Sequence, residues 1–114
     1  MTDEGRVKKL INEYLDSIGC IPAGKAVNAT AEHVGWYWMP VPGGYGVSFL
    51  DYVGHLKGRF FSVEAKKDDK TEPKALQKQQ IKAVRTTGGI SFVVGSPETL
   101  QPFKAWCEKI LQED

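Results

Sequence analysis

Residues 51–66 read DYVGHLKGRFFSVEAK. The segments 47–53 and 59–65 are rich in β-branched and aromatic residues, and glycines stand on both sides of the turn between them. A pattern of this kind predicts a β-hairpin, with its turn centred on Leu56 and Lys57.

Two acidic side chains share one face of this predicted hairpin. The register places Asp51 opposite Ser62, and Glu64 lies diagonally across from Asp51 at roughly 7–8 Å. Lys66 follows on the same face. Because two close carboxylates resist ionisation, and a divalent cation between them removes that penalty, the pattern predicts a Mg²⁺ or Mn²⁺ site.

The chemistry of such a site is phosphodiester hydrolysis. A metal-activated water is the usual nucleophile, and a lysine beside it stabilises the negative charge that grows on the phosphate. The plainer alternative for Glu64 and Lys66 is a surface ion pair on an edge strand. That alternative does not explain why Asp51 falls on the same face as Glu64.

The composition is that of an ordinary globular protein. With 114 residues, 41% hydrophobic and 25% charged, the chain is predicted to form a single domain over residues 1–114. Its net charge of +1 means that any basic surface must be local. Cys20 and Cys107 match no metal or redox spacing and are expected to be buried thiols of a reduced protein.

Several classes of protein are disfavoured by what the sequence lacks. No apolar segment approaches the ~20 residues that span a bilayer, and the polar start lacks a signal-peptide core, so we expect a soluble, cytoplasmic protein without membrane contact. Residues 43–46 predict a flexible turn without the spacing of a phosphate-binding loop, so we expect no nucleotide cofactor.

An amphipathic helix is predicted over residues 4–18, with Asp3 as its cap and Gly19 at its end. Glu4 lies on the stripe of its apolar residues and can therefore point toward the packed face. The alternative is that this acid only favours the helix N-terminus.

The segment that follows is predicted to be mostly irregular. Residues 20–35 are rich in Gly, Ala, Pro, Asn and Thr, which predicts a loop with a helical turn near 29–33. Residues 36–39 read WYWM and predict a short strand. Its tryptophans are expected to pack in the core, with stacking on a base or sugar as the alternative.

A second helix is predicted over residues 73–87, with Pro73 in its first turn. Gln77 stands in the apolar stripe of this helix and needs a partner, for which the acidic pair is the candidate. The adjacent face carries a basic stripe made of Lys74, Lys78, Lys82 and Arg85. Together with Lys67, the stripe is predicted to bind a phosphate backbone, and a solvated face is the default alternative.

The chain then continues with a buried strand at 90–94 and a helix that starts at Ser96 and Pro97. The apolar stripe of this helix is expected to cover one face of the sheet. The order α-β-β-β-α-β-α predicts an α/β fold, a mixed central sheet flanked by helices.

Taken together, these residues resemble the VRR-NUC branch of the PD-(D/E)XK nuclease superfamily, in the small stand-alone form common in bacteriophages. The resemblance covers nearly the whole chain and is carried by Glu4, residues 46–51, Gly58-Arg59, Glu64-Ala65-Lys66, Gln77 and residues 88–94. Leu50 stands where the family usually has proline. Because proline donates no ligand, this difference leaves the implied chemistry unchanged.

The resemblance implies a restriction-endonuclease-like PD-(D/E)XK core and assigns a role to each site residue. Asp51, Glu64 and the backbone carbonyl of Ala65 would hold Mg²⁺ or Mn²⁺. Glu4 would bind or orient the metal and its water, with Glu13 on the same helix as the alternative. The implied catalytic residues are Glu4, Asp51, Glu64, Lys66 and Gln77.

The expected function is a Mg²⁺- or Mn²⁺-dependent DNA endonuclease that acts as a homodimer on branched or flapped DNA, as Holliday-junction resolvases do, in the cytoplasm or the host cytoplasm of a phage. Three alternatives stay open: a non-catalytic nucleic-acid-binding module of the same fold, a nuclease for single-stranded DNA, RNA or a specific duplex, and a structural protein. The sequence leaves open the metal, the cleavage polarity and the oligomeric state.

Overall fold

The structure is a computed structural model that describes residues 2–41 and 50–113. The predicted turn at 43–46 and residues 47–49 of the predicted strand at 47–53 lie outside the described residues.

The described residues form one sheet with helices before, between and after its strands. The strands lie side by side in the order β1-β2-β3-β4-β5. β1 pairs with β2 in parallel, and β4 pairs with β5 in parallel. Between them, β2, β3 and β4 form an antiparallel meander. The elements in chain order are α1 (Asp3–Ser17), β1 (Cys20–Pro22), the 3₁₀ helix η1 (Ala23–Asn28), β2 (Gly35–Trp38), β3 (Tyr52–Leu56), β4 (Arg59–Ala65), α2 (Ala75–Thr86), β5 (Ile90–Val94) and α3 (Pro97–Leu111). The predicted mixed sheet flanked by helices is confirmed, with one strand more than expected.

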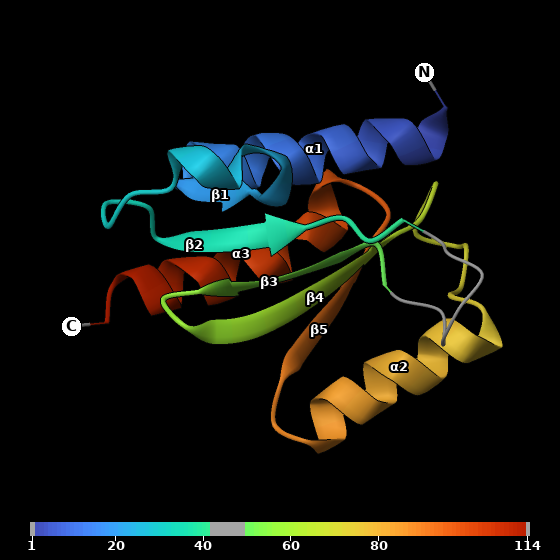
Figure 1. Ribbon diagram of the computed structural model, residues 1–114. Helices are drawn as coiled ribbons and strands as arrows, with labels where there is room; N and C mark the ends of the chain where they lie inside the picture. Colours follow the sequence, from blue (N-terminus) through green and yellow to red (C-terminus); the bar gives the residue numbers. More distant parts are fainter. Residues whose placement is uncertain (1, 42–49, 114) are drawn as a thin grey trace.

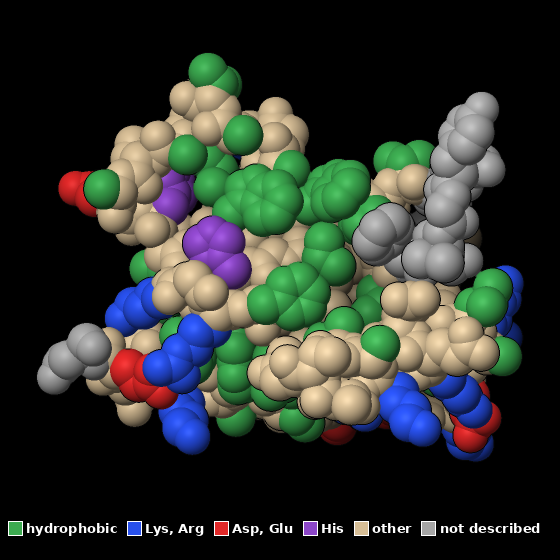
Figure 2. Space-filling view, turned by 60° about the horizontal axis from the view of Figure 1, so that its bottom comes forward, with side chains coloured by type: hydrophobic (Ala, Val, Ile, Leu, Met, Phe, Trp, Pro, Cys, Tyr) green, Lys and Arg blue, Asp and Glu red, His purple; other side chains and the backbone are tan. Residues whose placement is uncertain are grey.

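The helices cover the two faces of the sheet unequally (Figure 1). α1 and α3 lie on one face and enclose the core, whose largest fully buried side chains include Tyr52, Phe61 and Phe103. α2 lies on the other face and packs against β5. Seen from that side, the molecule shows hydrophobic side chains gathered at its surface (Figure 2).

Helix α1 forms because its apolar residues recur at helical spacing, and Val7, Ile11 and Leu15 are buried as predicted. Its cap is Thr2, whose hydroxyl accepts the N–H of Gly5 at 2.9 Å, so the prediction of Asp3 as the cap is wrong by one residue. Asp3 instead occupies the first turn, where an acid favours the helix dipole.

The β3–β4 hairpin is confirmed, but its predicted turn is wrong. The two turn residues are Lys57 and Gly58, with φ of 50° and 82°. Two-residue hairpin turns of type I′ match the twist of the strands and need positive φ at both positions, which glycine adopts freely. Leu56 is fully buried and pairs with Arg59 as the last pair of the ladder, so it does not lie in the turn.

The register of the hairpin is therefore two residues away from the prediction. Val53, and not Asp51, pairs with Ser62. A shift of two residues keeps every side chain on its predicted face. Asp51 directly precedes β3, so the corrected ladder places it straight across from Glu64 instead of diagonally.

The predicted loop at 20–35 contains more structure than its composition indicated. Residues 20–22 form β1, which pairs with β2 in parallel, and the helical turn falls at η1 and not at 29–33. On its other side, β2 approaches β3 closely at Gly35, because a Cβ at that position would lie 2.2 Å from the carbonyl oxygen of His55.

Of the two tryptophans of β2, Trp36 is half-buried and Trp38 is 42% exposed, so the prediction that both pack in the core is wrong for Trp38.

The second half of the chain follows the prediction closely. Helix α2 begins after Lys74, so Pro73 precedes the helix and does not lie in its first turn. β5 and α3 are confirmed, and Ser96 caps α3 with its hydroxyl while Pro97 occupies the first turn. The longest helices, α1 and α3, have 15 residues each, and no helix of the described segments has the length and apolar character needed to cross a membrane.

Candidate active site

The start of α1, the start of β3, the end of β4 and the start of α2 meet at one end of the sheet (Figure 1). Asp51 and Glu64 lie there and are joined through the backbone. The N–H of Asp51 donates to Glu64 Oε2 at 3.3 Å, and the N–H of Ala65 donates to Asp51 Oδ2 at 2.8 Å. The two carboxylates are thereby fixed relative to each other.

Glu64 is the most deeply buried acid of this cluster, with only 1% of its surface exposed. Burial and the neighbouring Asp51 carboxylate raise the pKa of Glu64 from 4.5 to about 8, and the charge of Lys66 opposes this rise only in part. A cation near Glu64 would therefore change its protonation at neutral pH.

Lys66 and Gln77 complete a network around this acid. Lys66 as a whole residue is 8% exposed, and its ammonium lies 3.5 Å from Glu64 Oε1. Gln77 donates from Nε2 to Glu64 Oε1 at 2.9 Å, and its Oε1 accepts from Lys66 Nζ at 2.9 Å. The same oxygen accepts the N–H of Lys74 at 2.9 Å, so the side chain also holds the first turn of α2. Gln77 thus fixes both charged side chains.

Lys8 is a site residue that sequence reasoning missed. Its Nζ lies 3.7 Å from Asp51 Oδ1. Tyr52 holds this part of α1 in place, because its hydroxyl donates to Asn12 Oδ1 at 2.7 Å and lies 3.1 Å from the Lys8 carbonyl oxygen. The available signal was the spacing from Glu4, since residues four apart share one face of a helix.

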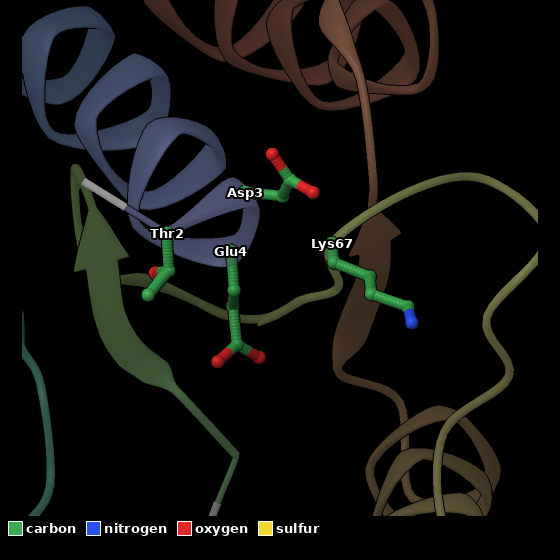
Figure 3. A pocket seen from close by; sticks show the side chains of 4 residues that line it. All are labelled: Thr2, Asp3, Glu4 and Lys67. Atoms are coloured by element: carbon green, nitrogen blue, oxygen red, sulfur yellow. The ribbon is translucent and has the colours of Figure 1, made fainter.

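Glu4 lies beside a pocket and not within the hydrogen-bonded network. Thr2, Asp3, Glu4 and Lys67 line this pocket, which has a volume of about 580 Å³ (Figure 3). The carboxylates of Asp3 and Glu4 point in different directions from the first turn of α1, and Lys67 extends from the segment after β4.

Glu13, the alternative to Glu4, lies elsewhere on α1. Its side chain is 62% exposed, and its carboxylate pairs with Lys9 at 3.8 Å along the helix surface. Of the two glutamates, Glu4 alone lines the pocket next to Lys67.

The basic stripe of α2 is exposed, but two of its members are already engaged. Lys78 pairs with Glu72 at 2.9 Å, and Arg85 donates to the carbonyl oxygen of Ser91 at 2.7 Å. Lys74 and Lys82 are also exposed. The role of these residues and of Lys67 in nucleic-acid binding stays a prediction.

The oxygen donors of Asp51 and Glu64 suit a hard divalent cation such as Mg²⁺, which usually takes one or two carboxylates together with water and phosphate. In the described part of the chain, no third acid, histidine or cysteine joins them in a metal-binding group. The chemistry of the pair fits a two-carboxylate site, and Lys8 and Lys66 balance its charge in the structure.

Comparison of the chain with protein-family models, curated proteins and solved structures finds no match.

Proposed function

We propose that the protein is a Mg²⁺- or Mn²⁺-dependent DNA endonuclease with a PD-(D/E)XK core of the VRR-NUC type. The observation that carries this proposal is the joining of Asp51, Glu64, Lys66 and Gln77 in one network at the end of the sheet where α1 and α2 begin. An acid pair with a buried lysine held by a glutamine is an arrangement suited to phosphodiester hydrolysis.

Each side chain has a defined task in this proposal. Asp51, Glu64 and the Ala65 carbonyl supply the oxygens that hold the cation. When bound, the cation lowers the pKa of water and neutralises charge on the phosphate. Lys66 places a positive charge beside the oxygen that becomes more negative during the reaction, and Gln77 keeps the Lys66 ammonium oriented.

Glu4 and Lys67 line the adjoining pocket, where Glu4 orients water and Lys67 attracts the DNA backbone. Branched or flapped DNA is the proposed substrate, and a homodimer the proposed form, because paired cuts across a junction need two sites related by a two-fold axis. Both assignments rest on the VRR-NUC resemblance.

The test is cleavage of labelled four-way junction, flap, duplex, single-stranded DNA and RNA with Mg²⁺, Mn²⁺ or EDTA. Glu64→Gln is expected to abolish metal-dependent cleavage, and Lys66→Met to reduce it by about 10²-fold or more. Glu13→Gln and Lys9→Met are the matched controls, since these residues form an exposed pair on α1. Cleavage that survives Glu64→Gln would contradict the proposal.

A second candidate is a nucleic-acid-binding module without catalysis. It is favoured by one observation: Lys8 and Lys66 lie within 3.7 Å and 3.5 Å of the two acids and balance them without a cation. Salt-sensitive DNA binding with no cleavage of any substrate under either metal would support this candidate. Cleavage of single-stranded DNA or RNA alone would support the proposed active site but assign it a different substrate.

A further inference from the structure

Two lysines contact the acid pair, and they differ in how firmly each is held. Only 10% of the Lys66 side chain is exposed, and its ammonium donates to Gln77 Oε1 at 2.9 Å besides lying 3.5 Å from Glu64 Oε1. Lys8 lies 3.7 Å from Asp51 Oδ1, and 33% of its side chain is exposed. The ammonium of Lys66 is therefore fixed inside the site, whereas that of Lys8 has access to solvent.

The backbone that carries Lys8 is held in place. The hydroxyl of Tyr52 lies 3.1 Å from the Lys8 carbonyl oxygen and donates to Asn12 Oδ1 at 2.7 Å. Val7 and Ile11 of the same helix are buried in the core. The side chain of Lys8 thus starts from a fixed point beside the acid pair, and its flexible four-carbon stem decides where the ammonium goes.

The neighbouring cations of α1 have other partners. Arg6 pairs with Asp3 at 3.4 Å, and Lys9 pairs with Glu13 at 3.8 Å. These four side chains are between 62% and 70% exposed. Lys8 differs from both cations by its contact with the acid pair, so Lys9 provides a matched comparison for it.

The ion pair of Lys8 uses a carboxylate that the proposed metal site also needs. Asp51 Oδ2 accepts the N–H of Ala65 at 2.8 Å, and Oδ1 faces Lys8. With a divalent cation on this carboxylate, the ammonium would stand next to a second positive charge. Like charges this close repel each other, and more strongly beside a protein than in bulk water. Metal binding is therefore expected to release Lys8 from Asp51.

We propose that Lys8, once released from Asp51, binds a phosphate oxygen of the DNA strand at the site. An ammonium suits this task, because it is a compact charge with three donors, and contacts of lysine with phosphate position a strand without reading its bases. This inference rests on the proposed nuclease function and deepens it. Lys8 becomes a substrate-binding residue, and the binding of metal and of DNA each favour the other.

The test compares the affinity for DNA in excess Ca²⁺ and in EDTA. Ca²⁺ is a hard cation that takes oxygen ligands, as Mg²⁺ does. The probe is a labelled flap DNA, which holds a duplex, a branch and a single strand in one molecule, and readings are taken on DNA that a denaturing gel shows to be uncut. Fluorescence anisotropy gives the two affinities, and their ratio measures the coupling between metal and DNA.

Lys8→Met should weaken flap binding in Ca²⁺ by about ten-fold, as loss of one hydrogen bond to a charged group predicts. In EDTA its effect should be small, because Asp51 holds the ammonium of the parent chain there. Lys8→Arg keeps the charge and should retain the ratio of the parent chain. Lys9→Met is the matched control and should also retain it. A merely structural role of Lys8 would not confine the loss to Ca²⁺.

Equal weakening by Lys8→Met in Ca²⁺ and in EDTA would overturn the inference, since Lys8 would then act as a general surface charge. Unchanged affinity in both would overturn it too, because Lys8 would then serve Asp51 alone. So would a parent chain that does not bind flap DNA in Ca²⁺. Methionine keeps the apolar stem of the half-buried lysine, and Lys8→Gln gives the same comparison should Lys8→Met not fold.

The two proposals fail separately. Metal-dependent cleavage by a chain in which Lys8→Met leaves the ratio unchanged would keep the nuclease and remove the role of Lys8. A ratio that depends on Lys8, in a chain that cuts no DNA with Mg²⁺ or Mn²⁺, would do the reverse.

Discussion

Lys8 and Asp51 form an ion pair between α1 and the start of β3, with Nζ 3.7 Å from Oδ1. Both side chains are partly exposed, at 33% and 23%. A divalent cation that binds Asp51 has to compete with this ammonium. The ion pair would therefore lower the affinity of the site for a metal ion.

Lys8→Met is expected to tighten Mn²⁺ binding by up to about five-fold, since a partly exposed pair contributes about 0.2–1 kcal/mol. Calorimetric titration with Mn²⁺ measures this directly. Lys9→Met removes the neighbouring lysine, which pairs with exposed Glu13, and should leave the affinity unchanged. An equal affinity of Lys8→Met and the parent chain would show that Lys8 does not compete.

Gln77→Leu should destabilise the fold by about 1–3 kcal/mol, because buried Glu64 loses a hydrogen-bond donor and Lys66 an acceptor. Urea unfolding gives the free-energy change. Gln79→Leu alters an exposed residue on the same helix and should have little effect. Were both variants equally stable, Gln77 would not hold the network together.

The basic stripe is expected to contribute to the salt dependence of DNA binding. Alanine at Lys74, Lys78 and Lys82 is expected to weaken DNA binding and to flatten the slope of log affinity against log salt by about 0.7–0.9 for each phosphate that a lysine no longer neutralises. Lys82→Ala should act more strongly than Lys78→Ala, whose lysine already pairs with Glu72. Fluorescence anisotropy over a range of salt concentrations provides the slopes, and an unchanged slope would identify a solvated face.

The buried thiols predict a loss of stability at alkaline pH. Burial raises the pKa of Cys20 from 9.0 to about 11 and that of Cys107 from 9.0 to about 12. Since the folded values exceed the unfolded ones, the contribution of the thiols is intact below pH 9.0 and is lost as pH rises from there toward the folded values. Each thiol accounts for up to about 1.4 kcal/mol per pH unit in that range.

Urea unfolding at about pH 8 and about pH 10 tests this dependence. The decrease in stability between the two should be smaller in a Cys20→Ala, Cys107→Ala double variant than in the parent chain. Burial and the neighbouring Cys107 raise the pKa of Tyr14, so the comparison reports the thiols together with their effect on this tyrosine. A decrease of the same size in both would show that the thiols ionise as freely in the folded state as in the unfolded one.

Much of the fold could be predicted because local pattern determines it. The apolar stripes of α1 and α3 and the apolar segment at β5 are decided by residues within one element. The short β1 could not be found in this way, since its three residues are held by pairing with β2 across an irregular connection.

The hairpin shows why the face of a residue was easier to predict than its register. Gly54 and Gly58 both mark turns in the sequence, but Gly54 lies inside β3, where a Cβ would come within 2.2 Å of the Trp36 carbonyl oxygen. Only the neighbouring strand distinguishes the two glycines. Lys8 was missed for a related reason, because its partner is distant in the chain.

Tyr52 connects the site to α1 through contacts that are distant in the sequence. Its hydroxyl contacts with Asn12 and Lys8 span 40 and 44 residues of sequence, whereas the β3–β4 hairpin closes through a two-residue turn. Short-range contacts form before long-range ones, because closing a long loop costs more chain entropy. If folding follows this order, Asp51 and Glu64 face each other before the ammonium of Lys8 reaches them, and a cation present at that stage would meet Asp51 without its competitor.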